Sequence, residues 1–247
     1  MDLSIVIPAY NEAEKIAHDI EAAAAFLVRE GITGELLVVD DGSDDDTAEV
    51  AGGAPVPEGV TRRLIRYTPN RGKGYAVRTG MLQSTGDCAM FADVGLCVPF
   101  DNALRGLEPI RHGQCDIAHG SRKLPESVLV RKQHPVRRFC SWAFRKAAGI
   151  MMGIPGKLSD TQCGFKIYRG DVARELYGKC LADGFMFDIE VLLRALRAGY
   201  RVIEFPVEWR CDYDTRLHTA QDGAGAFTEL RQIKRRLKQE DQAGGQE

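Results

Sequence analysis

The stretch of sequence that decides the fold lies early in the chain and reads Leu36-Leu37-Val38-Val39-Asp40-Asp41-Gly42-Ser43. Four consecutive apolar residues predict a short buried β-strand, and the acidic pair followed by Gly-Ser predicts a turn at the carboxyl end of that strand. In open α/β sheets, ligands bind in the crevice at the carboxyl ends of the strands. Two carboxylates at this place suit hydrogen bonds to a base or a ribose, or a bound cation.

Two further apolar stretches end in polar residues in the same way. Residues 2–8 lead into Ala9-Tyr10-Asn11-Glu12, and residues 88–92 lead into Asp93. Taken alone, residues 40–43 are better explained as the cap of the next helix, because Asp and Ser are favoured at helix N-termini. The repetition of polar residues at three strand ends favours one shared site along the rim of a sheet.

The spacing of apolar residues and the turn-forming residues between them predict the other elements. Helices are expected over residues 11–30, 44–50 with Ser43 as cap, 70–82, 135–152, 187–198 and 228–238. Strands are expected over residues 35–39, 63–67, 88–92, 116–120, 164–168 and 201–206. The alternation of strands and helices in the first half predicts a mostly parallel α/β sheet with helices on both faces.

Length and composition indicate one domain. The 247 residues are 44% hydrophobic, which is enough for one large α/β domain, and no linker is long enough to separate two. A formal net charge of −2 gives no field that would recruit nucleic acid. Seven cysteines without a CxxC pair argue against a disulfide framework and for a reducing compartment, so a cytoplasmic location is expected. Neither a transmembrane helix nor a signal peptide is expected.

Six motifs occur in one order through nearly the whole chain: Ile7–Glu12, Val39–Ser43, Asn70–Gly74, Asp93 with its neighbours, Gly120–Arg122 and Asp160–Lys166. Together they resemble family 2 glycosyltransferases of the GT-A fold, and among these the dolichyl-phosphate glucose and dolichyl-phosphate mannose synthases. The resemblance implies one Rossmann-like GT-A domain over residues 1–238, with a nucleotide-sugar half over 1–98, an acceptor half over 99–238 and a flexible tail over 239–247. The form of the last motif resembles the glucosyl branch and favours UDP-glucose over GDP-mannose.

The resemblance also implies a set of nucleotide-binding residues. Asp41 is the expected base contact, and Arg71 and Lys73 are expected over the nucleotide sugar. Residues 70–74 lack the spacing of a P-loop, and on their own they are better explained as a helix-opening turn with a solvated lysine. The full set implied for the nucleotide comprises Pro8, Ala9, Tyr10, Glu12, Asp41, Arg71, Lys73, Asp93 and Arg216.

Asp93 is the candidate ligand for Mg²⁺ or Mn²⁺. GT-A enzymes usually present Asp-x-Asp, and this chain has Gly95 in place of the second carboxylate and Cys97 two positions further on. A thiol is a poor ligand for a hard cation. Three interpretations remain open: Asp93 suffices together with diphosphate oxygens and waters, a basic side chain replaces part of the work of the metal, or the site is impaired. The first is favoured.

The acceptor side is implied by basic residues in the second half. The resemblance assigns the acceptor phosphate to Arg122, Arg137 and Ser141, the last two lying one helical turn apart. It also gives Arg122, Asp160 and Lys166 catalytic roles alongside Asp93. Because a phosphate acceptor is already ionised, Asp160 is open to two roles: a general base, or a group that orients a sugar hydroxyl or an arginine. A solvated basic helix face is the plainer explanation of Arg137.

The function implied is inverting transfer of a hexose from a nucleotide sugar to a polyprenyl or dolichyl phosphate. Two alternatives stay open: a soluble transferase with a small-molecule or glycan hydroxyl acceptor, and a nucleotide-sugar-binding protein without activity. Peripheral membrane contact is expected through the basic helix at 228–238 and the basic segment 137–146. A helix packed on the domain with a solvated basic side is the plainer alternative for 228–238. The sequence does not decide the oligomeric state.

Overall fold

A computed structural model describes residues 1–130, 146–156, 158–210 and 221–244 of the chain. The strands of its main sheet are β1 (Leu3–Ala9), β2 (Gly34–Asp40), β3 (Thr61–Arg66), β4 (Cys88–Ala92), β5 (Ile117–Ser121), β7 (Phe165–Arg169) and β8 (Val202–Pro206). They form a seven-stranded sheet in the order β3-β2-β1-β4-β7-β5-β8. A small separate ribbon pairs β6 (Val128–Leu129) with β9 (Glu208–Trp209).

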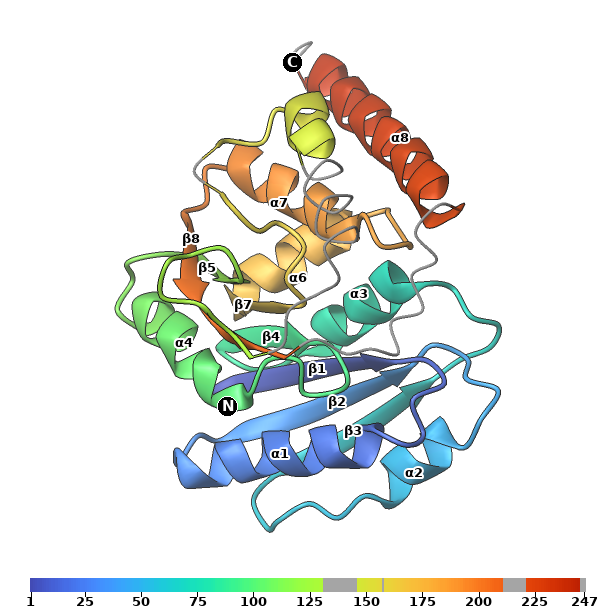
Figure 1. Ribbon diagram of the computed structural model, residues 1–247, viewed down its shortest axis with the longest axis vertical. Coiled ribbons are helices and arrows are strands. Elements are labelled where there is room, and N and C mark those ends of the chain that lie inside the picture. Colours follow the sequence, from blue (N-terminus) through green and yellow to red (C-terminus); the bar gives the residue numbers. More distant parts are fainter. Residues whose placement is uncertain (131–145, 157, 211–220, 245–247) are drawn as a thin grey trace.

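Helices cover both faces of this sheet (Figure 1). One face is covered by α1 (Ile16–Arg29), α2 (Thr47–Gly53), the short η1 (Phe100–Asn102) and α4 (Ala103–Arg111). The other is covered by α3 (Lys73–Gln83), α6 (Gly170–Lys179) and α7 (Phe187–Arg197), with α8 (Gln221–Gly244) packed against this second layer. Residues 146–152 are also helical, and the rest of the helix expected over 135–152 lies outside the described residues. The single α/β domain expected from the sequence is therefore confirmed, and its fold matches the GT-A architecture.

The apolar runs of the central strands are explained by burial on both faces. In β2, Leu36 and Val38 enter the hydrophobic cluster beneath α1, whereas Leu37 and Val39 enter the cluster beneath α3. All four side chains are fully buried. A strand between two helical layers needs apolar residues at every position, which is why such strands read as continuous runs and show no alternation.

The sheet is mostly parallel, as predicted, but one strand runs the other way. Four of the six strand pairings are parallel, and β7 is antiparallel to both its neighbours, β4 and β5. Because of this reversal, the first residues of β7 lie at the carboxyl end of β4, with Phe91 opposite Lys166. The reversed strand thus brings Lys166 to the rim where the loops after β1, β2 and β4 meet.

Several predicted boundaries were wrong. The helix expected at 44–50 begins at Thr47, and Ser43 does not cap it, since its hydroxyl bonds the carboxylate of Asp40. The helix expected from residue 11 begins at Ile16. Two helices, α4 and α6, were not predicted; α4 contains Pro109, which argues against a helix at the sequence level.

The C-terminal part also differs from expectation. Helix α8 continues through Gly244, so residues 239–244 are helical where a flexible tail was expected. Its apolar side chains Leu230, Ile233 and Leu237 are at most 2% exposed and pack into the second core. The packed alternative for this helix is therefore correct for its apolar face. Within the described ranges, no helix is both long enough and apolar enough to span a bilayer.

Candidate active site

The loops after β1 and β2 form the first wall of the site. The backbone N–H of Asn11 donates to the Ser43 hydroxyl at 2.8 Å, and that of Asp44 donates to the Asn11 side chain at 2.8 Å. The N–H of Glu12 donates to the Thr47 hydroxyl at 2.7 Å. These bonds link loop 9–12 to loop 40–47. Of the predicted nucleotide residues, Tyr10 and Glu12 lie in loop 9–12, and Pro8 and Ala9 are the last residues of β1. The polar residues at the two strand ends thus fix the conformation of each other's loop through hydrogen bonds.

Asp41 holds the loop that precedes α3. One carboxylate oxygen accepts from the Tyr67 hydroxyl and the Arg71 N–H, both at 2.8 Å. The other accepts from the Asn70 amide and the Gly72 N–H, both at 2.9 Å. A carboxylate offers about four acceptor positions, and all four are used here within the chain. Asp41 is thus a structural anchor of loop 70–72, and a direct contact with a base would displace one of these donors.

Replacement of Asp41 by alanine is expected to weaken nucleotide binding by about tenfold or more, because four donors around loop 70–72 lose their acceptor. Isothermal calorimetry with UDP measures this change. Tyr67→Phe is the matched control, because it removes one donor and leaves the other three bonds intact. Equal affinities of the Asp41→Ala variant and the unmodified protein would show that this loop takes no part in nucleotide binding.

Lys73 and Asp93 meet at the rim. Lys73 is the first residue of α3, and its ammonium lies 2.7 Å from a carboxylate oxygen of Asp93, directly after β4. Burial alone would lower the pKa of Lys73, but the Asp93 carboxylate raises it above its ordinary value. The side chain of Lys73 is 28% exposed and that of Asp93 33%, so the pair faces an open part of the molecule. Beside it, the Arg71 guanidinium stacks 3.6 Å from the Tyr75 ring centre.

The loop after Asp93 is bonded to Asp19 of α1. The carboxylate of Asp19, in the first turn of α1, accepts hydrogen bonds from the N–H groups of Gly95 and Leu96 at 3.0 Å. Both residues have positive φ, 97° at Gly95 and 47° at Leu96. Position 95 therefore lacks the second carboxylate and has a backbone conformation that favours glycine.

Introducing a carboxylate at Gly95 is consequently not expected to restore a metal site. An aspartate there would have to adopt φ near 97°, which is unfavourable for any residue with a Cβ. We expect Gly95→Asp to lower the free energy of unfolding by about 1–3 kcal/mol and to leave Mn²⁺ affinity unchanged. Urea unfolding and Mn²⁺ titration followed by electron paramagnetic resonance measure the two effects. A folded variant that binds Mn²⁺ more tightly would contradict this explanation.

Asp19 predicts a pH dependence of stability. Burial raises the pKa of Asp19 from 3.8 to about 6, although the Gly95 and Leu96 N–H groups oppose the shift. Between these pH values the folded chain binds the proton more tightly than the unfolded chain, so the contribution of Asp19 to stability falls as the pH rises from about 4 to 6. Relative to Asp19→Asn, the unmodified protein should lose roughly 2–3 kcal/mol between pH 4 and pH 7 in urea unfolding. A constant difference between the two proteins would contradict the raised pKa.

Lys166 and Asp188 form a buried ion pair behind the rim. The Lys166 ammonium lies 2.6 Å from the Asp188 carboxylate and also donates to the carbonyl of Thr161 at 3.0 Å. The Lys166 side chain is fully buried, and burial raises the pKa of Asp188 while the lysine opposes the shift. Asp188 stands in the first turn of α7. Lys166 therefore holds the start of α7 and the Thr161 loop in place, and its ammonium is not exposed to solvent.

Arg122 and Asp160 form the third ion pair. The guanidinium of Arg122 donates to both oxygens of Asp160, at 2.6 and 2.8 Å, and its backbone N–H donates to the same carboxylate at 3.0 Å. Asp160 is fully buried, whereas the Arg122 side chain is 20% exposed and lies over the Trp209 ring. Of the two roles left open for Asp160, the structure supports the group that orients an arginine.

The three pairs belong to one cluster. The negative charge of Asp93 raises the pKa of both Lys73 and Arg122. The positive charges of Lys166 and Lys73 act in the opposite direction to burial on the pKa of Asp188. The cluster gathers at the ends of β4 and β5 and at the starts of β7, α3 and α7. We call it the rim cluster: Lys73, Asp93, Arg122, Asp160, Lys166 and Asp188. Three cations balance three anions, so each basic group of the rim cluster is paired with a carboxylate.

The residues fit a divalent cation only in part. Among the described residues, no group of three or more His, Cys, Asp or Glu side chains is arranged to hold a metal. Asp93 is the carboxylate that reaches the open side of the rim cluster, and the Lys73 ammonium already lies against it. Mg²⁺ commonly takes only one or two protein carboxylates and completes its shell with phosphate oxygens and water. Asp93 fits that pattern only when a diphosphate supplies further ligands.

Some predicted residues cannot be placed. Arg137, Ser141 and Arg216 lie outside the described residues. Conversely, three acidic residues that hold loops around the site were not predicted: Asp19, Glu204 and Glu229. Glu204 accepts hydrogen bonds from the backbone N–H groups of Ser159 and Asp160. Only Asp19 left a signal in the sequence, because it is an acid within the apolar stripe of an otherwise amphipathic helix.

Comparisons with known proteins find relatives over most of the chain. A dolichyl-phosphate beta-glucosyltransferase of Drosophila melanogaster is 32% identical over 221 residues, covering 85% of this chain and 67% of that protein. The human protein of the same name is 30% identical over 219 residues, covering 84% of this chain and 67% of its own length. Glycosyltransferase AglD of Haloferax volcanii is 30% identical over 235 residues, but the chain spans only 36% of its length.

Solved structures give the same fold. Glucosyl-3-phosphoglycerate synthase from Mycobacterium tuberculosis, in complex with Mn²⁺, UDP-glucose and phosphoglyceric acid, matches with a TM-score of 0.72 at 19% sequence identity. The match covers 94% of this chain and 79% of that chain. The profile of glycosyl transferase family 2 matches residues 4–177, which is more than half of the chain and includes five of the six residues of the rim cluster. The chain therefore belongs to glycosyl transferase family 2.

Proposed function

We propose that the protein transfers a hexose, with inversion, from a nucleotide sugar to the phosphate of a polyprenyl or dolichyl lipid. The observation that carries the proposal is the rim cluster, which places Lys73 and Arg122 at one edge of the sheet beside the loops after β1 and β2. The relatives with about 30% identity named dolichyl-phosphate beta-glucosyltransferase support this acceptor class. Their names also support glucose as the transferred sugar, and UDP-glucose is proposed over GDP-mannose as its donor.

The donor is proposed to lie along loops 9–12, 41–43 and 70–73. Helix α3 begins at Lys73, so its positive N-terminal end and the ammonium both favour a diphosphate. A divalent cation held by Asp93 and the diphosphate would neutralise charge on the leaving group, and the Mn²⁺ complex of the M. tuberculosis structure supports this use. Arg216, proposed near the diphosphate, lies outside the described residues.

The chemistry requires positioning and charge stabilisation. An acceptor phosphate oxygen attacks the anomeric carbon and forms a new C–O bond, while the bond from that carbon to the nucleotide diphosphate breaks. The acceptor is ionised at neutral pH, so no general base is needed, which agrees with the engagement of Asp160 by Arg122. Lys73 stabilises the departing diphosphate, and Arg122 with Arg137 and Ser141 is proposed to hold the acceptor phosphate.

A small phosphorylated acceptor is the second candidate. It is favoured by the M. tuberculosis synthase, whose complex contains phosphoglyceric acid. The arginine at the rim cluster suits either acceptor, because a guanidinium binds a phosphate whether or not a lipid is attached.

The deciding experiment measures sugar transfer by the purified chain. UDP-glucose and GDP-mannose are each supplied with dolichyl phosphate in detergent, with 3-phosphoglycerate, or with no acceptor, in Mn²⁺ or in EDTA. Release of UDP that depends on the lipid phosphate supports the proposal, and release that depends on the small acceptor supports the second candidate. Binding of UDP-glucose without release under any condition would instead support a protein that binds nucleotide sugars without transferring them.

Peripheral membrane contact at a cytoplasmic surface is proposed on electrostatic grounds. The apolar face of α8 packs on the domain, so its exposed basic side chains, including Arg231, Lys234 and Arg235, would make the contact. Flotation with anionic vesicles at low and high ionic strength tests this. Binding that persists at high salt, or no binding at low salt, would contradict an electrostatic contact.

A further inference from the structure

The position of Lys73 is set by a backbone loop from the other half of the chain. The N–H of Tyr75 donates to the carbonyl of Asp183 at 3.1 Å. A Cβ atom placed on Gly72 would lie 2.6 Å from that carbonyl oxygen, and one on Gly74 would lie 2.6 Å from the carbonyl oxygen of Ala182. These distances leave no room between the start of α3 and the loop formed by residues 181–186. Lys73 lies between the two glycines, so a movement of the loop moves its backbone.

Two carboxylates, one buried and one partly exposed, hold this loop from behind. Glu190 on α7 is fully buried and accepts the N–H groups of Leu181 and Ala182. Glu229 on α8 accepts the N–H groups of Gly184 at 3.1 Å and Met186 at 3.3 Å. Met186 immediately precedes α7, whose first turn carries Asp188. The bonds of Glu229 therefore act on the start of both helices that contribute to the rim cluster.

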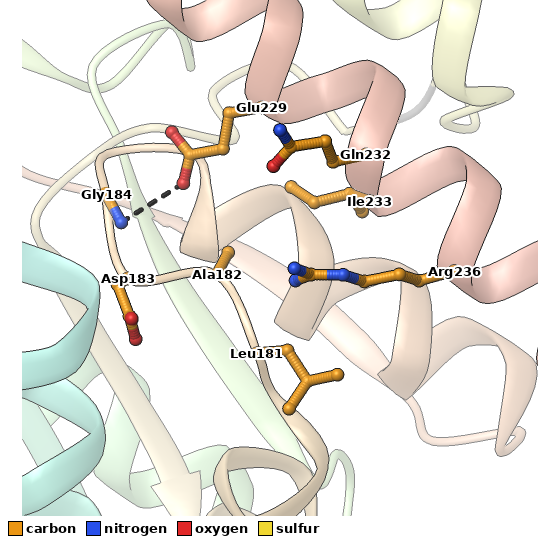
Figure 2. Close-up of a pocket in the computed structure, with 8 residues that line it drawn as sticks. All are labelled: Leu181, Ala182, Asp183, Gly184, Glu229, Gln232, Ile233 and Arg236. Carbon is orange, nitrogen blue, oxygen red and sulfur yellow. Dashed lines mark hydrogen bonds between the residues drawn. The ribbon is translucent and has the colours of Figure 1, made fainter.

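A partly open pocket of about 250 Å³ lies between the loop and α8, and Figure 2 shows the Glu229 carboxylate reaching toward Gly184 across its edge. The pocket is lined by Leu181, Ala182, Asp183, Gly184, Glu229, Gln232, Ile233 and Arg236. Because side chains do not fill this pocket, the loop is packed less tightly on this side and depends more on its hydrogen bonds. Partial burial raises the pKa of Glu229.

We propose that Glu229 is a positioning residue, through which α8 fixes the loop 181–186 and thereby the places of Lys73 and Asp188. This inference rests on the proposed function insofar as Lys73 meets the donor diphosphate. The family profile matches residues 4–177 only, so the loop, α7 and Glu229 all lie beyond the part of the chain that it covers. The C-terminal helix then supplies a support for the donor site from outside the family-matched segment.

The test compares Glu229→Ala with Asp241→Ala in the full chain. Asp241 also joins α8 to α7, through an ion pair of 3.0 Å with Arg197, and within the described residues it bonds neither the loop nor Glu190. Hydrogen exchange should accelerate at least tenfold in peptides covering 181–186 and 70–76 in Glu229→Ala, and stay unchanged there in Asp241→Ala. UDP affinity, measured by calorimetry with Mn²⁺, should fall about tenfold in Glu229→Ala only. Glu229→Gln keeps one acceptor oxygen, so its exchange rates and its UDP affinity should lie between those of Glu229→Ala and the unmodified protein.

The outcomes separate this proposal from the proposed function. Faster exchange in 181–186 with unchanged exchange in 70–76 would overturn the positioning role, as would equal effects of the two alanine variants. If the unmodified chain does not bind UDP, the proposed function fails, whereas the exchange measurements still decide whether Glu229 positions the start of α3.

Discussion

Replacement of Asp188 by alanine is expected to lower the free energy of unfolding by about 3–5 kcal/mol, the largest stability effect in the chain. The reason is its partner, because the Lys166 side chain is fully buried and its ammonium lies 2.6 Å from Asp188. Without that carboxylate, the ammonium keeps the Thr161 carbonyl and the face of the Phe91 ring, neither of which carries a full negative charge. A buried cation left in this way must either remain uncompensated or lose its proton.

Urea unfolding of three variants tests this prediction. Asp171→Ala is the control, because it breaks a pair in which Asp171 is 64% exposed, and such pairs contribute at most about 1 kcal/mol. The double variant Lys166→Met with Asp188→Leu removes both charges and should lose less stability than Asp188→Ala alone. A loss in Asp188→Ala no greater than in the control would show that Lys166 finds another partner.

Replacement of Lys73 by methionine is expected to lower kcat/KM for sugar transfer by about 10²–10³-fold, the largest effect on activity. The ammonium stands at the start of α3 and is the cation paired with Asp93 at the open side of the rim cluster. Its loss removes a positive group from the leaving diphosphate and leaves the Asp93 carboxylate to repel the donor. Methionine keeps most of the aliphatic length, so the packing at the start of α3 is largely preserved.

Lys179→Met is the matched control, because Lys179 is a lysine on α6 that pairs only locally with Glu175, four residues away. Steady-state kinetics over a range of donor and Mn²⁺ concentrations measure both variants. If Lys73 and the cation share the work of stabilising the diphosphate, the defect of Lys73→Met grows as Mn²⁺ is lowered. A decrease in kcat/KM of less than threefold in Lys73→Met would show that Lys73 does not stabilise the leaving diphosphate.

Much of the donor side could be predicted from local sequence. A buried strand followed by polar residues is a short-range pattern, and parallel strands bring their carboxyl ends to one edge. The pattern therefore identified Asp41 and Asp93 as residues of one rim, whereas Lys73 was assigned only through the resemblance to family 2 glycosyltransferases. The structure does bring the loops that carry these three residues together. What these side chains do was less predictable: Asp41 anchors loop 70–72, and Asp160 orients Arg122.

The amino-acid sequence by itself determined the α/β class, the central strands and the strand-end loops, since apolar periodicity and turn residues act over a few positions. Only the tertiary structure decided the antiparallel direction of β7 and the partners of the buried charges. Lys166 meets Asp188, and Glu229 meets Gly184, across separations of 22 and 45 residues. Such pairings depend on how whole elements pack, because a periodic pattern records which face of an element is buried and not what it is buried against.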